Sequence, residues 1–177
     1  MKRVILSLVA AASLLGSGSA MAALAVGAKA PDFTTRGAIA GKTFTVTLSH
    51  QLKRGPVVLY FFPKAFTPGC SAEAREFAEN IDKFKAAGAT VIGMSADPVD
   101  DLVAFSTKEC AGKFAVASAG PNIVSGYDVA LKMRPGMTDR TSYVIAPSGR
   151  IAFVHSEMNY SGHVKSTLAA VEAMKQK

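Results

Sequence analysis

Cys70 is the residue of this 177-residue chain whose position says most about chemistry. It follows the apolar run Val57–Phe62, which is typical of a buried strand. Thr67 and Pro68 then suit the N-cap and the first position of a helix, so the thiol falls in the first helical turn. Free backbone N–H groups and the helix dipole favour a thiolate there, and the thiolate is the reactive form of cysteine. The alternative is that Cys70 is a small buried hydrophobe, a common fate of a free cysteine.

The other residues that could carry chemistry are few and widely spaced. Cys70 and Cys110 are the only cysteines, which excludes a C-x-x-C dithiol site and a C-x-x-C-H haem attachment site. The histidines His50, His155 and His163 lie far apart in the sequence and lack the spacing of metal ligands. We therefore expect no metal ion and no bound cofactor.

Strands and helices alternate around Cys70. We expect strands over 43–48, 57–62, 90–95 and 114–117, and a hairpin of 143–146 with 151–154. We expect helices from Thr67-Pro68 to Gly88, from Asp97-Pro98 to Gly112, over 123–131 and around 164–174, with Asp97-Pro98 capping the second. The residues expected to face the core are Ala74, Phe77, Ala78, Ile81 and Phe84 in the first helix, Val99, Leu102, Val103 and Ser106 in the second, and Val164, Leu168, Val171 and Met174 in the last.

This order of elements predicts an α/β fold, with a central mixed sheet flanked by helices on both faces. Ligand sites in open α/β sheets lie beyond the carboxyl ends of the strands, and Cys70 has that position. The sequence shows no internal repeat, low-complexity tract or second domain. We expect residues 23–177 to form a single domain.

Residues 1–22 have the pattern of a secretory signal peptide. Lys2-Arg3 is followed by an apolar stretch, 4–15, and by the small-residue cleavage pattern Ala20-Met21-Ala22. The apolar stretch is too short to span a bilayer, so we expect a periplasmic protein without a membrane partner. The formal net charge is +7, but the lysines and arginines are scattered. They form no basic stripe with interleaved aromatic residues, so we expect no nucleic-acid partner.

The pattern Pro63-x-x-x-Thr67-x-x-Cys70 resembles the active-site segment of peroxiredoxins, and most closely that of the bacterioferritin-comigratory-protein or peroxiredoxin Q branch. The resemblance extends over nearly all of 23–177 and includes the segments 26–33, 91–97 and 139–145. It implies a thioredoxin-like fold and thiol-dependent reduction of hydrogen peroxide and organic hydroperoxides, an antioxidant activity. It also implies that a thioredoxin-like protein or a small thiol is the reductant. We expect a monomer or a weak dimer.

The resemblance also implies roles for the residues of that segment. Cys70 would be the peroxidatic cysteine, which attacks a peroxide oxygen and becomes a sulfenic acid. The Thr67 hydroxyl would cap the helix and also contact the incoming peroxide. Pro63, which has no N–H group, would shield the thiolate from water. The plainer alternatives are that Thr67 is only a cap and that Pro63 only ends a strand.

A cation is needed beside the thiolate, both to stabilise it and to polarise the peroxide. The family places this cation just before the strand that begins at Thr141, where this chain has Arg140. The alternative for Arg140 is a solvated loop charge. Arg134, in the same loop, is the second candidate. Glu73 lies one turn after Cys70 and could orient the arginine by accepting a hydrogen bond. It could also be an ordinary surface carboxylate.

Cys110 is the candidate resolving cysteine. Many members of this branch carry that cysteine five residues after the peroxidatic one, where this chain has Arg75. Cys110 continues the line of Val103 and Ser106 on its helix, so simple burial is equally consistent with its position. It also lies near a helix C-terminus, where the dipole disfavours a thiolate. If Cys110 is inert, the protein is a one-Cys peroxidase that an external thiol recycles.

Two other functions remain open at this point. The first is a thiol–disulfide oxidoreductase on the same fold, against which the missing C-x-x-C motif counts strongly. The second is a non-catalytic secreted domain with a structural Cys70–Cys110 disulfide, since two cysteines in an oxidising compartment often pair.

Overall fold

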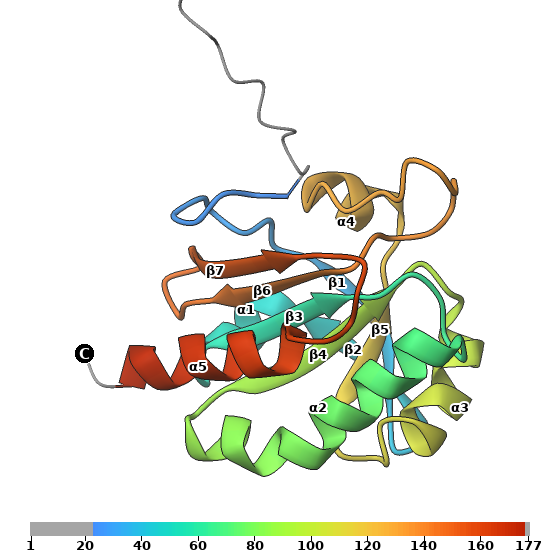
Figure 1. Ribbon diagram of the computed structural model, residues 1–177, viewed down its shortest axis with the longest axis horizontal. Helices are drawn as coiled ribbons and strands as arrows, with labels where there is room; N and C mark the ends of the chain where they lie inside the picture. The colour runs from blue at the N-terminus through green and yellow to red at the C-terminus, as the bar shows by residue number, and fades with distance from the viewer. Residues whose placement is uncertain (1–22, 176–177) are drawn as a thin grey trace, which may run out of the picture.

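A seven-stranded mixed sheet forms the centre of the computed structural model, which describes residues 23–175. The strands lie in the order β2-β1-β5-β4-β3-β6-β7 (Figure 1). The strands β3, β4 and β5 run parallel, and the hairpins β1–β2 and β6–β7 add antiparallel strands on either side. The predicted α/β fold with a mixed central sheet is therefore confirmed. The strand bounds are β1 Thr34–Ile39, β2 Lys42–Thr47, β3 Val57–Phe61, β4 Thr90–Ser95, β5 Ala115–Ser118, β6 Thr141–Ile145 and β7 Ile151–Ser156.

Helices cover both faces of this sheet (Figure 1). Side chains of α2, α3 and α5 pack in the core on one face, and those of α1 and α4 pack in the core on the other. No helix within residues 23–175 is both long enough and apolar enough to cross a membrane. The helix bounds are α1 Leu48–Leu52, α2 Pro68–Ala86, α3 Val99–Lys108, α4 Pro121–Gly126 and α5 His163–Lys175.

Strand β3 separates the two cores. Every residue of β3 is buried, as expected for a central strand with both faces covered. Because successive side chains of a strand point to opposite faces, Val58 and Tyr60 enter the core beneath α2, whereas Leu59 and Phe61 enter the core beneath α1 and α4. The strand thus fixes the position of the segment that leaves its carboxyl end, which leads directly into α2.

Helix α2 buries the stripe that its sequence predicts. Pro68 occupies the first helical turn, and Gly88, with φ of +80°, follows the helix in a conformation that glycine adopts without strain. The Phe77 ring stacks on Tyr60 of β3 with centroids 4.3 Å apart. The predicted inward-facing residues are all buried: Ala74, Phe77, Ala78, Ile81 and Phe84.

Two helices differ from their predicted form. In α3 the residues buried most deeply include Phe105, whereas Val99 and Val103 are only partly buried. The helix predicted over 123–131 is instead α4, which ends at Gly126. Asp128, with φ of +52°, takes a left-handed backbone conformation that stops the helix there.

The N-terminal part of the sheet also contains more structure than predicted. One strand, over 43–48, is expected there, and it is present as β2. The structure adds β1, which pairs with β2 on one side and with β5 on the other, and the short helix α1. Gly37 of β1 allows the close pairing with β5, since a Cβ atom there would lie 2.8 Å from the Val116 carbonyl oxygen. A glycine and an arginine within β1 hide its strand pattern in the sequence.

We predict that Gly93→Ala destabilises the fold. A Cβ atom at Gly93 of β4 would lie 2.7 Å from Cζ of Tyr60, and that ring cannot retreat because it is fully buried and stacked on Phe77. Such overpacking lowers the free energy of unfolding by about 1–3 kcal/mol, which urea denaturation measures. Gly120→Ala is the matched control, since nothing lies within 4 Å of its added Cβ. Equal stability of the two variants would contradict this account of the core.

Candidate active site

Cys70 lies in the first turn of α2, near the carboxyl ends of the parallel strands. The chain leaves β3 at Phe61, crosses the segment 62–67 and enters α2 at Pro68. The Cys70 side chain is only 1% exposed. Its position thus matches the one that the sequence predicts, and a molecule that reaches the sulfur in this conformation must be small.

Asp97 anchors the segment between β3 and α2. Its carboxylate accepts hydrogen bonds from the Ala65 backbone N–H (2.7 Å) and the Ser95 hydroxyl (2.6 Å), and it pairs with the Lys64 ammonium (3.1 Å). Asp97 was expected to cap α3. That prediction is wrong, because Pro98 occupies the N-cap position and no side chain caps the helix. The carboxylate is used instead to satisfy a buried backbone N–H group of the active-site segment.

The same segment contains a strained residue. Phe66 has φ of +62°, a left-handed conformation that is costly for an aromatic residue. Its ring packs edge-on against Phe105 of α3, with centroids 5.3 Å apart. The fixed Ala65 N–H on one side and this ring contact on the other hold the strained turn that leads into α2.

Thr67 occupies the N-cap position of α2 with an extended backbone, but its side chain does not cap the helix. The hydroxyl donates to the Lys64 carbonyl oxygen (2.9 Å) instead, so the predicted side-chain cap is wrong. The Thr67 carbonyl oxygen accepts the N–H of Ser71 (2.9 Å), which begins the helical hydrogen-bond pattern. Pro63 lies partly buried at the other end of the segment, just beyond β3.

Arg140 is the cation that the structure places beside Cys70. It directly precedes β6 and is 5% exposed. One terminal nitrogen, Nη2, donates to the Cys70 Sγ atom at 3.4 Å, and Nη1 forms an ion pair with Glu73. The Nε–H group donates to the Met158 carbonyl oxygen (2.9 Å). Burial opposes the charge of Arg140, but Glu73 and Cys70 outweigh burial and raise its pKa above the ordinary value.

Glu73 is fully buried behind this arginine. Burial raises the pKa of Glu73 above its ordinary value, and the charge and hydrogen bond of the Arg140 guanidinium work against the rise and favour the carboxylate. Its Oε2 atom contacts Arg140, and its Oε1 atom has no hydrogen-bond partner among the described residues. Nδ1 of His163 lies 3.7 Å from Oε1. Glu73 is therefore not the surface carboxylate of the alternative interpretation.

Cys110 lies just beyond α3 and is fully buried. Burial raises the pKa of the Cys110 thiol, and the adjacent Glu109 carboxylate adds to the rise. Both cysteines are free thiols in this structure. Arg75, five residues after Cys70, pairs with Glu109 at 2.7 Å. Cys110 is therefore a buried, unpaired thiol within the core on the α2 face of the sheet, the same core that contains Cys70.

Among residues 23–175, no hydrogen bond joins any of the remaining candidates to the Cys70 sulfur. Arg134 lies exposed in the loop before Arg140, and His50 lies exposed on α1. His155 and His163, distant in sequence, stack edge to face with ring centroids 4.4 Å apart. No group of three or more histidine, cysteine, aspartate or glutamate side chains that could hold a metal ion occurs among residues 23–175.

Sequence reasoning missed several residues that hold the site together. Asp97 has another predicted role, and no role is predicted for Met158, for His163 or for Ser142, whose hydroxyl lies 2.8 Å from Nδ1 of His163. Three of them act through a backbone carbonyl or through a buried side chain, neither of which leaves a local sequence signal. Only Asp97, which lies two residues after the end of the predicted strand 90–95, carried a usable signal for a position at the edge of the sheet where Cys70 lies.

The arrangement brings a thiol, the N-terminus of a long helix and a buried cation together. Each of the last two stabilises negative charge on sulfur, so the arrangement supports a thiolate nucleophile. The same guanidinium can stabilise charge that develops on a reactant oxygen close to the sulfur. The chemistry that follows is attack by sulfur on a small electrophile.

Comparison with known proteins places this site in a family. Residues 26–154 match the family model described as "AhpC/TSA family". The chloroplastic peroxiredoxin Q of Gentiana triflora is 30% identical over 156 residues, which cover 88% of this chain and 70% of the relative. Peroxiredoxin Bcp of Bacillus subtilis is 29% identical over 157 residues, 86% of this chain and 98% of the relative.

A solved structure also resembles this chain. The peroxidoxin BcpB of Mycobacterium tuberculosis superposes with a TM-score of 0.75 at 27% identity and covers 84% of this chain and 97% of its own. This likeness confirms the predicted thioredoxin-like fold, and the matches favour neither a thiol–disulfide oxidoreductase nor a non-catalytic domain. The chain belongs to the AhpC/TSA family and, within it, to the peroxiredoxin Q and Bcp group of thiol-dependent peroxidases.

Proposed function

We propose that Cys70 is the peroxidatic cysteine of this peroxidase and that Arg140 is the cation that activates it. The observation that carries the proposal is the contact between Arg140 Nη2 and Cys70 Sγ, 3.4 Å long, in the first turn of α2. The substrates are hydrogen peroxide and organic hydroperoxides. The electrons that return Cys70 to the thiol come from a thioredoxin-type protein or a small thiol.

In the first step, the Cys70 thiolate attacks one oxygen of the peroxide. A sulfur–oxygen bond forms as the oxygen–oxygen bond breaks, so sulfur is oxidised to a sulfenic acid and the peroxide is reduced. The leaving hydroxide or alkoxide takes up a proton and departs as water or an alcohol. Negative charge moves from sulfur to the leaving oxygen during this step, and Arg140 stabilises it at both positions.

Two neighbours complete the peroxide site in this proposal. The Thr67 hydroxyl uses its hydrogen on the Lys64 carbonyl oxygen, which leaves its oxygen lone pairs free to accept the O–H group of a peroxide. Pro63 stands at the opposite end of the same segment, partly buried and without an N–H group. It would keep water and bulky oxidants away from the sulfur.

Glu73 orients Arg140 in this proposal. The guanidinium group is planar, and its contacts to the Glu73 carboxylate and the Met158 carbonyl oxygen fix the plane in which Nη2 reaches Cys70. Since Glu73 is fully buried, no solvent molecule at the protein surface can substitute for that contact.

The burial of Cys110 supports recycling by an external thiol. Its side chain is fully buried and its raised pKa leaves little thiolate at neutral pH. Because Cys110 is fully buried, local opening of the chain around it would be needed before its thiol could ionise and react as a thiolate. We therefore place Cys110 in the core rather than in the catalytic cycle.

Residues 1–22 lie outside the described part of the chain, and we propose that they form a cleaved signal peptide. The charged start, the apolar stretch and the small residues before Ala23 support this proposal. The peroxidase domain would then comprise residues 23–177 and would work in the periplasm, as a monomer or a weak dimer.

Replacing Arg140 by methionine tests the core of the proposal. Arg140→Met keeps most of the side-chain volume but removes the donor to sulfur, so the second-order rate of Cys70 oxidation should fall by about 10²-fold. Stopped-flow mixing with hydrogen peroxide measures this rate, and Cys70→Ser should show no oxidation at all. Arg134→Met, in the exposed part of the same loop, is the matched control and should keep the wild-type rate. Normal turnover by Cys70→Ser would overturn the assignment.

Replacing Cys110 by serine tests how the enzyme is recycled. We expect Cys110→Ser to keep wild-type turnover with thioredoxin as the reductant. After one equivalent of peroxide, mass spectrometry should find a sulfenic acid on Cys70 of the reduced wild-type protein. A Cys70–Cys110 disulfide in the wild type, together with lost turnover in Cys110→Ser, would instead make Cys110 the resolving cysteine.

The proposed location can be tested by expression of the full chain in a Gram-negative host. The periplasmic fraction should contain a protein whose N-terminal residue is Ala23, because the apolar stretch directs export and the small residues permit cleavage. A chain that begins at Ala23 should remain in the cytoplasm. An uncleaved full-length protein confined to the cytoplasm is the result that contradicts the proposal.

A further inference from the structure

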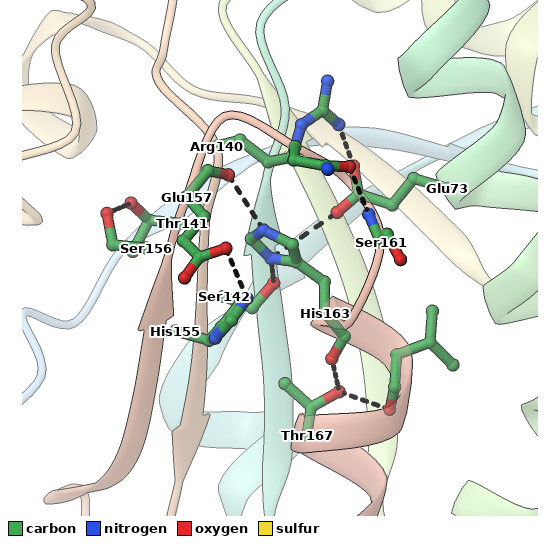
Figure 2. Close-up of polar contacts among 12 residues, drawn as sticks. Glu73, Arg140, Thr141, Ser142, His155, Ser156, Glu157, Ser161, His163 and Thr167 are labelled. Atoms are coloured by element: carbon green, nitrogen blue, oxygen red, sulfur yellow. Dashed lines mark hydrogen bonds and ion pairs between the residues drawn. The ribbon is translucent and has the colours of Figure 1, made fainter.

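His163 is a buried polar residue that the peroxidase chemistry described above does not use. It is the first residue of α5 and is fully buried. Figure 2 shows its ring between Glu73, Ser142 and the chain at Glu157. A buried imidazole needs partners for both ring nitrogens, and a hydrophobic side chain would avoid that requirement. The partners of His163 therefore indicate what it does.

The hydrogen bonds of His163 determine its tautomer. Nε2 lies 3.0 Å from the Glu157 carbonyl oxygen, which can only accept, so Nε2 carries the hydrogen. Nδ1 then accepts the hydroxyl of Ser142 at 2.8 Å. The neutral ring thus ties the start of α5 to β6 on one side and to the chain that follows β7 on the other.

That chain is also what holds Arg140. The Met158 carbonyl oxygen accepts the Nε–H group of Arg140 (2.9 Å), and the Glu157 backbone N–H donates to the Arg140 carbonyl oxygen (3.1 Å). The residue pair Glu157–Met158 therefore lies between two supports. His163 holds this pair from the core. The pair in turn holds both the backbone and the guanidinium of Arg140.

His163 also faces the second partner of Arg140. Its Nδ1 atom lies 3.7 Å from Oε1 of Glu73, the buried carboxylate oxygen that has no hydrogen-bond partner among the described residues. The ring therefore forms the wall against which the Glu73 carboxylate rests. Movement of this wall would change the direction of the Glu73 contact that orients Arg140.

We propose that His163 is a positioning residue of the peroxidatic site, which holds the Glu157–Met158 pair and the wall beside Glu73 so that the Arg140 guanidinium points at Cys70. This inference rests on the proposed role of Arg140. His163 itself touches neither the sulfur nor the site where a peroxide binds.

The ring remains neutral in this role. The charged and titratable groups that face it are Glu73 on α2, Arg140 before β6, and His155 and Glu157 on β7 and just beyond it. Burial lowers the pKa of His163 to about 4, the hydrogen bond to Glu157 opposes that effect, and His155 and Arg140 reinforce it. A neutral imidazole adds no charge that would repel Arg140.

A double-mutant cycle tests the proposal. His163→Leu fills a similar volume but offers no hydrogen bond, and we expect it to slow Cys70 oxidation by about tenfold or more in the wild-type background. In the Arg140→Met background the same change should have no further effect, because the guanidinium through which His163 acts is absent. Equal slowing in both backgrounds, or no slowing in the wild type, would overturn the proposal.

Matched variants separate positioning from general packing. His155→Leu alters the neighbouring ring, which packs on His163 and lies 4.0 Å from the exposed Glu157 carboxylate but makes no contact with the Glu157 carbonyl oxygen, and it should keep the wild-type rate. His163→Gln retains an N–H donor within reach of Glu157 and should restore most of the rate. His163→Asn, whose amide is shorter, should not. If His163→Leu fails to fold, His163→Asn takes its place in the cycle with the same criteria.

The two proposals fail in different ways. A wild-type oxidation rate in Arg140→Met would contradict the proposed role of Arg140, whatever His163→Leu does. A slow Arg140→Met beside a fast His163→Leu would contradict only the role of His163. Urea denaturation of each variant gives the stability separately, so a loss of stability without an Arg140-dependent loss of rate counts against positioning.

Discussion

One buried cation shared by two acidic groups is the constraint on which this structure depends. Arg140 lies between Glu73 and the Cys70 thiol, and all three side chains are almost completely buried. Removing charges from water carries a penalty of several kcal/mol per ion, so such groups persist only when each has a well-placed partner. The surrounding elements must therefore hold these three side chains at fixed positions.

The sheet and α2 meet this requirement through register and helical spacing. Thr141 pairs with Phe61, the last residue of β3, so Arg140 emerges at the point where the chain leaves β3 for the active-site segment. Cys70 and Glu73 are three residues apart on α2 and therefore share a face of that helix. Helix α2 and the start of β6, which are far apart in sequence, thus place the thiol, the carboxylate and the guanidinium next to one another.

The parts of this arrangement that the sequence predicted are those that local patterns encode. The apolar run of β3, the helix start at Pro68 and the β6–β7 hairpin have strong short-range signals, and the structure has all of them. Arg140 was expected beside Cys70 only through resemblance to a family. No spacing in the sequence relates it to α2.

The errors have a common physical origin. Asp97 and Thr67 are residue types that often cap helices. In the structure the Asp97 carboxylate accepts the Ala65 N–H instead, and the Thr67 hydroxyl donates to the Lys64 carbonyl oxygen; neither partner can be recognised in the sequence. The buried environment of His163 depends on how α5 packs against β6 and β7, and a histidine at a helix start gives no sign of it. Local sequence patterns thus predict the helices and strands, whereas the polar contacts between these elements can be seen only in the folded structure.

In the proposed catalytic cycle, the burial of Cys70 separates the conditions for its oxidation from those for its reduction. With 1% of the side chain exposed, the folded conformation offers almost no sulfur surface to a thiol carried on another protein. In the proposed cycle, oxidation uses the Arg140 contact and the intact first turn of α2, whereas reduction by a protein thiol needs that turn to open. Mutations that stiffen the N-terminus of α2 would thus slow reduction by a protein thiol and leave oxidation by peroxide unchanged. The stability of that turn is therefore a compromise between the two half-reactions rather than a maximum.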